Sequence, residues 1–420
     1  MELCLTLDHR FHQTPDGRAW TVTQCAYPFF SEYLEVFDSV RVIGRSFPAS
    51  EVGPNFLPVE GPAVGFFAMP SYKGPYQFLA NSLAVARRAS EAIPNGSAVL
   101  FRVPSQVANS VAKPLRARNH PYAVEVVADP YDVFSPSADP RIVAPVARRY
   151  FTRNVRSLVK NAVAVSYVTQ TYLQQRYPPV YSSHSAGNGQ SPDPCNDSRE
   201  QFVIGVSDAN LSDDAFCHRV RTRLHDPSVL RVVFVGTLGS LYKGPDTLIR
   251  AVAACHAQLV RVEVRFAGDG REKIALQLLC RELNISDRVD FLGDVQTGRC
   301  VREELDRADV FVLPSRAEGV PRAMLEAMAR SLPCIGSTVG GIPELLHSED
   351  LVPPDDAGAL AAQLIDVYRS EGRIQRMSER NLLTAGRYTK GALSARRKCF
   401  LEALRERTQK HFAHEAACLR

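Results

Sequence analysis

The sequence predicts an α/β protein with two doubly wound domains, and three observations support this. The chain has 420 residues, more than one ordinary hydrophobic core organises. Short apolar runs alternate with segments of helical period in both halves, which is typical of parallel strands covered by helices. Between the halves, a stretch rich in Ser, Pro, Gly and Asn indicates a linker. The expected parts are a first domain at 1–180, the linker at 181–203, a second domain at 204–390, and a C-terminal helix and tail at 391–420.

The expected elements of the first domain follow from its apolar runs. Strands are expected at Glu2–Leu7, Val40–Gly44, Val99–Val103, Tyr122–Ala128 and Val163–Val168. Helices are expected at Tyr27–Phe37, Pro75–Ala92, Ser105–Arg116 and Arg141–Asn161.

The second domain repeats the alternation more regularly. Strands are expected at Val232–Gly236, Val262–Gly268, Val289–Gly293, Asp309–Pro314 and Pro333–Ser337, and a long helix at Leu393–Lys410. In doubly wound sheets, ligands bind at the carboxyl ends of the strands. Two such domains facing each other would place the site in the cleft between them.

Composition narrows the function classes. The chain is 45% hydrophobic and 23% charged, with no apolar run long enough to span a membrane, so we expect a cytoplasmic globular protein. The apolar run before Asp8 lacks the basic start of a signal peptide. A net charge of +5 permits an anionic partner but does not indicate nucleic acid. The ten cysteines include no Cys-x2-Cys pair, which argues against a structural zinc site.

Three turns after strands of the second domain carry candidate catalytic or binding residues. The first turn begins at Gly236, the second follows Pro314, and the third contains Gly340 and Gly341. The turn from Gly236 to Lys243 precedes a helix that begins at Pro245, so glycine amides, a helix N-terminus and an ammonium could all meet a phosphate. The turn from Gly340 to Gly341 also precedes a helix and could expose amides. The alternative for each is an ordinary strand–helix loop.

Two glutamates follow the strand that ends at Pro314. Glu318 lies in the loop and Glu326 in the early turns of the next helix, so both could reach one cleft. Carboxylates accept hydrogen bonds from the paired hydroxyls of sugars and riboses. The alternative makes Glu318 a helix N-terminal residue favoured by the dipole and Glu326 a solvated helix residue.

These turns together resemble a known family. VGTLGSLYKGPDTLIRA, FAGDG, VDFLGDV and LPSRAEGVPRAMLEAMARSLPCIGSTVGGIPELL resemble, in order and spacing, the donor domain of retaining family 4 glycosyltransferases, the glycosyl transferases group 1 with the GT-B fold. The resemblance covers about residues 200–385. More loosely, LDHRFHQTPDGRAW and VEVVADPYDVF resemble bacterial surface-polysaccharide glycosyltransferases.

The resemblance implies a fold and a reaction. Two Rossmann-like domains would face each other across a cleft. The enzyme would move a hexose from a nucleotide-diphosphate sugar to a hydroxyl of a lipid-linked or saccharide acceptor, with retention of configuration, in surface polysaccharide or glycolipid synthesis. Leaving-group stabilisation would make a metal or other cofactor unnecessary, and no Asp-x-Asp motif occurs in the donor half.

The resemblance also implies roles for individual residues. Lys243 would contact the diphosphate, Glu318 the transferred sugar and Glu326 the ribose. Lys243, Glu318 and Asp129 are the catalytic candidates, although Asp129 could equally start a turn before Pro130. His9 is similarly ambiguous. The expected donor-binding set is Gly236, Thr237, Lys243, Gly268, Leu292, Gly293, Asp294, Glu318, Gly319, Val320, Arg322, Glu326, Gly340 and Gly341.

The chain departs from the family pattern at two places. Thr237 stands where the family usually has an Arg that contacts the diphosphate, so Arg316 and Arg322 are candidate replacements. Val320 and Pro321 replace an aromatic-Gly pair. The missing Arg keeps a non-catalytic nucleotide-sugar-binding subunit open, and a non-hydrolysing nucleotide-sugar epimerase is a further alternative. A dehydrogenase is disfavoured, because no strand leads into a G-x-G-x-x-G turn.

One expected helix suggests peripheral contact with the inner face of the plasma membrane. Arg149, Arg153, Arg156 and Lys160 fall at helical spacing, with Tyr150, Phe151, Val155, Leu158 and Val159 as apolar companions. The alternative is a surface helix packed on its own sheet.

Overall fold

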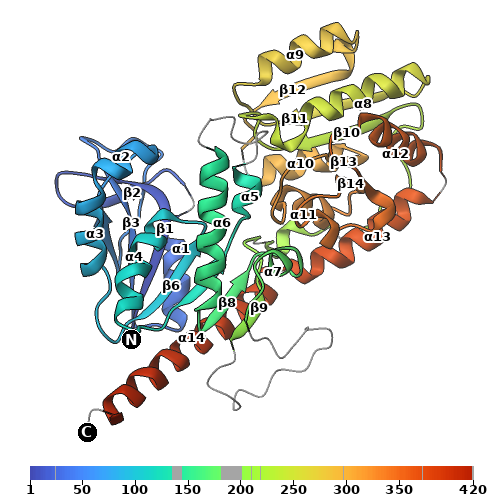
Figure 1. Cartoon of the computed structure of the whole chain (residues 1–420). Helices are drawn as coiled ribbons and strands as arrows, with labels where there is room; N and C mark the ends of the chain where they lie inside the picture. The colour runs from blue at the N-terminus through green and yellow to red at the C-terminus, as the bar shows by residue number, and fades with distance from the viewer. Residues whose placement is uncertain are drawn as a thin grey trace.

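The computed structural model describes residues 1–23, 25–134, 144–180, 201–209, 211–217, 219–296, 298–370 and 372–418. The chain forms two lobes, each a sheet flanked by helices (Figure 1). The predicted α/β class with two doubly wound domains is confirmed.

The first sheet is parallel except at one edge. Its parallel strands lie in the order β5-β3-β1-β6-β7-β8-β9, while β2 and β4 add antiparallel pairs beside the end of β1. The strands are β1 (Glu2–Gln13), β2 (Ala19–Thr21), β3 (Ser39–Pro48), β4 (Leu57–Pro58), β5 (Val64–Met69), β6 (Ala98–Val103), β7 (Ala123–Val126), β8 (Ala164–Tyr167) and β9 (Phe202–Gly205).

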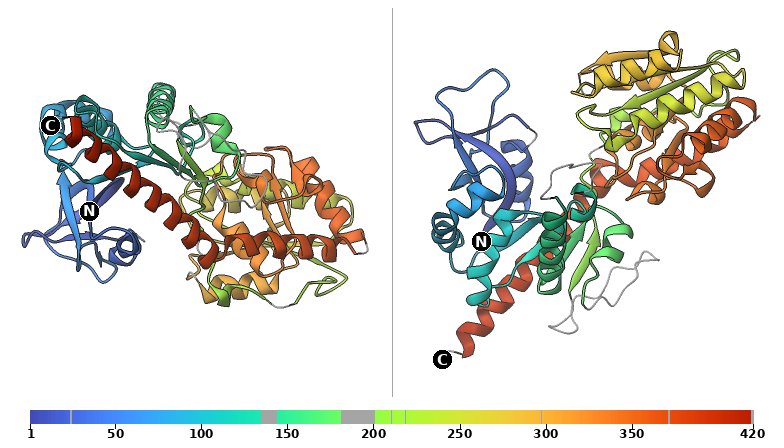
Figure 2. Two further views of the ribbon diagram at one scale, coloured as in Figure 1. Left: turned by 90° about the horizontal axis from the view of Figure 1, so that it is seen from below. Right: turned by 45° about the horizontal axis from the view of Figure 1, so that its top comes forward.

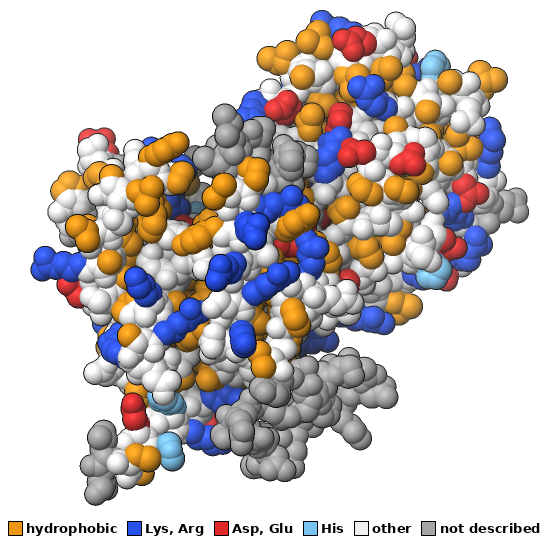
Figure 3. All heavy atoms as spheres, viewed as in Figure 1, with side chains coloured by type: hydrophobic (Ala, Val, Ile, Leu, Met, Phe, Trp, Pro, Cys, Tyr) orange, Lys and Arg blue, Asp and Glu red, His pale blue; other side chains and the backbone are white. Residues whose placement is uncertain are grey.

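The helices of the first domain cover this sheet. They are α1 (Tyr27–Ser31), α2 (Gly74–Ala80), α3 (Ser82–Glu91), α4 (Gln106–Ala117), α5 (Pro130–Val133), α6 (Ala144–Lys160) and α7 (Tyr172–Arg176). On the face seen in Figure 3, Lys and Arg side chains gather over α6.

Several elements of this domain differ from the sequence-based expectation, among them β2, β4 and β9, which were not expected. The strand β1 continues past Leu7 to Gln13 because β3 pairs with it along both of their lengths, across a register shift between Thr6 and Arg10. The strand β5 was not expected, since its short apolar run acquires strand structure only by pairing with β3. The expected helix Pro75–Ala92 is two helices, which meet at Asn81.

The chain passes between the domains twice. Within the predicted linker, residues 181–200 lie outside the described residues, and β9 then completes the first sheet beside β8. After the second domain, α14 (Lys390–Cys418) returns and buries Phe400, Leu401 and Leu404 in the core of the first domain. Figure 2 shows α14 running from the second lobe along the first.

The second sheet is entirely parallel and six-stranded. Its order is β12-β11-β10-β13-β14-β15, which is the order 3-2-1-4-5-6 of a Rossmann fold. The strands are β10 (Leu230–Val235), β11 (Val262–Ala267), β12 (Val289–Gly293), β13 (Val310–Leu313), β14 (Cys334–Ser337) and β15 (Leu351–Val352). The covering helices are α8 (Pro245–Ala257), α9 (Lys273–Glu282), α10 (Arg299–Arg307), α11 (Arg322–Ala329), α12 (Ala357–Arg369) and α13 (Arg373–Ala385).

The strand order reverses between β10 and β13, which pair through Val232 and Val310. Phe234, Phe266 and Phe311 are fully buried in this sheet's core. Because both strands are parallel, the loops after their carboxyl ends open at the same edge, where doubly wound proteins bind ligands. These loops carry Lys243 and Glu318.

No helix in the described part of the chain is long and apolar enough to cross a bilayer.

Candidate active site

Lys243 and Glu318, from the two loops at the point of strand reversal, form an ion pair. The Lys243 Nζ lies 3.2 Å from Glu318 Oε1 and 3.1 Å from Oε2, so it bridges both carboxylate oxygens. The side chains are only 13% and 12% exposed. Burial alone would lower the pKa of the lysine, but the charge of Glu318 and the neighbouring Tyr242 outweigh it and raise that pKa. Lys243 is therefore a fixed cation at neutral pH.

Two glycines let the Lys243 turn adopt this position. A Cβ atom on Gly236 would lie 2.7 Å from Lys243 Cδ, so the lysine stem runs across the glycine. Gly244 has a left-handed backbone, with φ of 71°, and precedes the first residue of α8. A Cβ there would lie 2.1 Å from the Pro314 carbonyl oxygen, so the loops after β10 and β13 pack backbone on backbone.

Arg316 fastens the same two loops together. Its backbone N–H donates to the Tyr242 carbonyl at 2.6 Å, and its guanidinium donates to the Leu241 carbonyl. The guanidinium also binds Asp246 through two bonds of 2.9 and 2.8 Å and Asp355 at 2.6 Å. Its charge is thus engaged by carboxylates of its own domain. Sequence reasoning did not assign it this role, because its partners are distant in the chain.

The third predicted turn supports the Glu318 loop. Gly340 has φ of 57°, and a Cβ on it would lie 1.7 Å from the Glu318 carbonyl oxygen. The Gly341 N–H, which we expected to face the donor, donates instead to the Gly319 carbonyl at 2.9 Å. These glycines let one loop lie directly against another, and Val320 packs beside Gly341.

The donor-binding candidates Gly236, Gly268 and Gly293 also lie in loops that pack backbone on backbone. A Cβ on Gly268 would lie 2.0 Å from the Gly236 carbonyl oxygen, and the Gly268 N–H donates to the Gly293 carbonyl at 2.8 Å. Leu292 and Gly293 are half-buried and Asp294 is exposed. Thr237 is exposed, and its hydroxyl accepts a bond from the Gly239 N–H at 3.0 Å. The structure thus brings the loops after β10, β11 and β12 together.

The Glu326 carboxylate differs from that of Glu318, which accepts from Lys243 and Ser315, in having no hydrogen-bond partner among the described residues. It lies half-buried on α11, four residues after the exposed Arg322. Burial raises the pKa of its carboxyl group, although Arg322 and Arg302 oppose that rise. Such a carboxylate can accept hydrogen bonds from vicinal hydroxyls, as the sequence predicted for a ribose.

Asp129 has a complete set of local partners. Its carboxylate caps α5 by accepting from the Tyr131 N–H at 2.8 Å, and it also accepts from Arg176 at 2.9 Å and from the Tyr177 hydroxyl. Its side chain is only 1% exposed. These contacts fit the alternative that the sequence left open, in which Asp129 starts a turn before Pro130. A catalytic role for Asp129 stays a prediction.

The first domain nevertheless comes close to the Glu318 loop. A Cβ on Gly319 would lie 4.0 Å from the carbonyl oxygen of Val127, at the end of β7. His9 of the same domain is bound by its own neighbours, with Nε2 at 3.0 Å from the Thr21 hydroxyl and 3.1 Å from that of Thr23.

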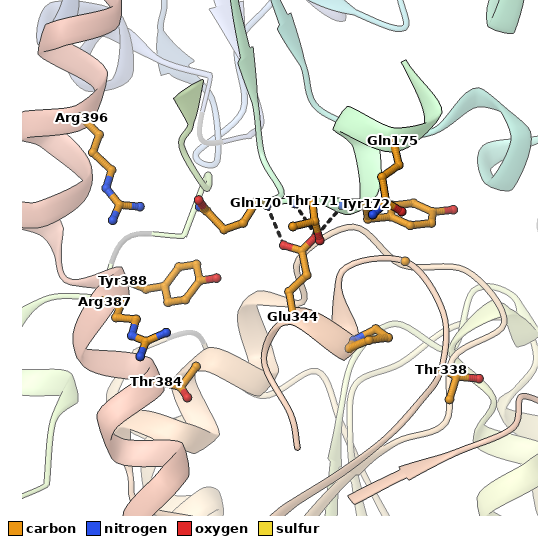
Figure 4. Close-up of a pocket in the computed structure, with 12 residues that line it drawn as sticks. Gln170, Thr171, Tyr172, Gln175, Thr338, Glu344, Thr384, Arg387, Tyr388 and Arg396 are labelled. Carbon is orange, nitrogen blue, oxygen red and sulfur yellow. Dashed lines mark hydrogen bonds between the residues drawn. The ribbon is translucent and has the colours of Figure 1, made fainter. Parts of the chain in front are cut away.

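Glu344 joins the two domains beside the third turn. Its carboxylate accepts backbone N–H bonds from Gln170 at 2.6 Å, Thr171 at 2.9 Å and Tyr172 at 2.7 Å, at the start of α7 (Figure 4). Together with Arg387 and Arg396 it lines a cavity of about 500 Å³. This contact could not be predicted from the sequence, because no local pattern links residues 170 and 344.

Two Rossmann-like domains, with a lysine and a glutamate at the strand-reversal point of the second, have the architecture of the GT-B fold that the sequence predicted. The solved structures agree in fold. HepE from Anabaena, crystallised with UDP and glucose, has a TM-score of 0.62 at 16% identity, over 96% of this chain and 100% of that one. Sucrose-phosphate synthase from Thermosynechococcus elongatus has a TM-score of 0.64 at 17% identity, over 96% and 98%.

Sequence comparison identifies the second domain. Residues 230–370 match the model of the glycosyl transferases group 1. The chain is 25% identical to Protein CapJ of Staphylococcus aureus over 79% of its own length and 78% of that protein's. It is 32% identical to the amylovoran biosynthesis glycosyltransferase AmsK of Erwinia amylovora, over 41% and 43% of the two lengths. The second domain thus carries a glycosyl transferases group 1 domain at residues 230–370, as its motifs predicted.

Proposed function

We propose that this enzyme transfers a hexose from a nucleotide-diphosphate sugar to a hydroxyl of a lipid-linked or saccharide acceptor, with retention of configuration. The observation that carries the proposal is the buried Lys243–Glu318 pair at the reversal point of the donor-domain sheet. Relatives of this chain suggest that the transfer serves surface polysaccharide synthesis, since AmsK is named for amylovoran biosynthesis and WcaL of Salmonella typhimurium for colanic acid biosynthesis. HepE, crystallised with UDP and glucose, makes UDP-hexoses the first donors to test.

The chemistry rests on the leaving group. As the bond between the sugar and the diphosphate breaks, negative charge grows on the phosphate oxygens, and a fixed cation there is worth more in the transition state than before it. Lys243 supplies that cation. Glu318 is bound through both oxygens to Lys243, so it is better suited to hold sugar hydroxyls than to attack the sugar. Retention then follows from attack by the acceptor on the face that the diphosphate leaves, as in the retaining family that the motifs resemble.

We also propose that no metal or other cofactor takes part. The Lys243 ammonium can neutralise the developing charge that a divalent cation neutralises in other transferases. Excess EDTA tests this directly.

A panel of nucleotide sugars, with release of the nucleoside diphosphate as the signal, identifies the donor. With that donor, Lys243→Met is expected to lower turnover about a hundredfold or more, the scale of losing one preorganised donor. Lys243→Arg should recover only part of the rate, because the guanidinium aims its donors differently. Lys410→Met is the matched control, since Lys410 pairs with Glu406 on α14. A folded Lys243→Met enzyme with an unchanged chemical step would contradict the proposal.

We also propose that the first domain binds the anionic inner face of the plasma membrane. On α6, Val155, Leu158 and Val159 turn inward and are buried, so these apolar companions pack on the sheet rather than on lipid. Arg149, Arg153, Arg156 and Lys160 of this helix are exposed. Figure 3 shows Lys and Arg side chains gathered over α6. Charge is therefore the main contribution of this helix.

Apolar anchors for that surface come from α2 and α3. Tyr76, Leu79 and Leu83 are 80%, 66% and 86% exposed. The Tyr72 ring packs on Phe78 of α2, with the ring centroids 5.2 Å apart. The first domain thus carries both exposed apolar side chains on α2 and α3 and basic side chains on α6, and this combination favours an anionic bilayer.

A further inference from the structure

In the proposed function, Lys243 has two anionic partners, the Glu318 carboxylate and the donor diphosphate. One ammonium holds both oxygens of one carboxylate, and the two side chains are nearly buried. A bound donor would bring a diphosphate to the same ammonium. Two anions would then share one cation in a poorly solvated site, where repulsion between them is costly.

This chain offers little else to balance the second anion. The position that carries an Arg in the family pattern is Thr237, which is uncharged. Of the two candidate replacements, Arg316 is held by Asp246 and Asp355, and Arg322 is exposed on α11, where its charge acts on Glu326. Backbone amides at the start of α8 could still hold a phosphate, but they carry no full charge, so we expect the diphosphate and Glu318 to compete for Lys243.

We propose, on the basis of the proposed function, that Glu318 occupies the place of the diphosphate on Lys243 in the empty enzyme, and that donor binding exchanges one anion for the other. The released carboxylate then accepts hydroxyls of the transferred sugar, while Ser315, whose hydroxyl lies 3.3 Å from Glu318 Oε2, keeps it at the site. After transfer, Glu318 returns to Lys243 and displaces the nucleoside diphosphate.

The exchange predicts how the enzyme distinguishes donor from product. When a nucleotide sugar binds, hydrogen bonds from the hydroxyls of its hexose to Glu318 replace the lost ion pair. The nucleoside diphosphate has no hexose, so the Glu318 carboxylate is left without a partner. Glu318 should therefore weaken binding of the product selectively. Removing its charge should tighten the product and weaken the nucleotide sugar.

Titration calorimetry with the nucleoside diphosphate and the nucleotide sugar identified by the donor panel tests this. Glu318→Gln is expected to tighten the nucleoside diphosphate about fivefold or more, because about fivefold is the upper end of the range for exposed ion pairs and this pair is nearly buried. Glu318→Asp keeps the charge but shortens the carboxylate, so it should also tighten this ligand, and it serves if the Gln variant does not fold. Glu326→Gln removes an equal charge without an ion pair and should not tighten it.

A double-mutant cycle separates exchange from simple repulsion. In a Lys243→Met background there is no pair to break, so Glu318→Gln should no longer tighten the nucleoside diphosphate. No tightening in the native background, or equal tightening in both, would overturn the exchange. If Lys243→Met by itself leaves affinity for this ligand unchanged, the diphosphate does not bind at Lys243 and the proposed function fails instead.

Discussion

Replacing Gly340 by Ala tests whether the third turn positions Glu318. Gly340 has φ of 57°, and its added methyl would lie 1.7 Å from the Glu318 carbonyl oxygen, whereas ordinary contact begins at 3.4 Å. The two backbones must therefore separate by about 1.7 Å, and a shift of about 1 Å at a reacting centre can lower a rate a hundredfold. We expect turnover of Gly340→Ala to fall about a hundredfold or more.

The stability cost has two parts, which a control separates. An alanine in the left-handed region costs about 1–2 kcal/mol in any setting, and the clash adds to this. Gly96 has φ of 78° and no atom within 4 Å of a built Cβ, so Gly96→Ala carries the backbone strain without the clash.

The assay compares both variants by urea unfolding and by the initial rate of nucleoside diphosphate release at saturating donor. Gly96→Ala should lose about 1–2 kcal/mol of unfolding free energy and keep its turnover. Gly340→Ala should lose more of both. If the two variants match in stability and in rate, Gly340 does not hold Glu318 in place and the reasoning fails.

Three further predictions concern the donor, the metal and the membrane. Donor affinity should fall as pH is lowered from about 8 to about 5, because burial raises the pKa of Glu326 and its protonation removes an acceptor for ribose hydroxyls. Glu326→Gln should abolish that pH dependence. If the dependence persists in Glu326→Gln, a group other than Glu326 causes it. Turnover should survive excess EDTA, and a lost rate that magnesium or manganese restores would refute metal independence. In liposome flotation, the double variant Leu79→Ser/Leu83→Ser should bind anionic vesicles more weakly than the unaltered protein. Leu383→Ser is the control and should not weaken binding, because Leu383 is similarly exposed but lies on α13 of the second domain. If the unaltered protein shows no preference for anionic over neutral vesicles at low salt, the proposed membrane contact is wrong.

The sequence by itself determined the fold class and most elements of the second domain. The strand Val289–Gly293 is found with the predicted bounds. Val310–Leu313 lies within the predicted Asp309–Pro314, because this strand is buried along its whole length and buried parallel strands read as continuous apolar runs. Local pattern was insufficient for β5 and for the end of β1. Those strands exist because β3 pairs with both of them, and such pairing is not encoded in either run alone.

The sequence also marked Lys243 and Glu318 as candidates, since both follow strands whose carboxyl ends meet. Only the tertiary structure decided that the two form one ion pair, that Gly340 packs against Glu318, and that Arg316 holds the Lys243 turn instead of standing free for a phosphate. The bond from Glu344 to the start of α7 is of the same kind. The physical reason is that each of these contacts joins residues far apart in the chain, so it depends on strand order and loop packing, which no local stretch of sequence specifies.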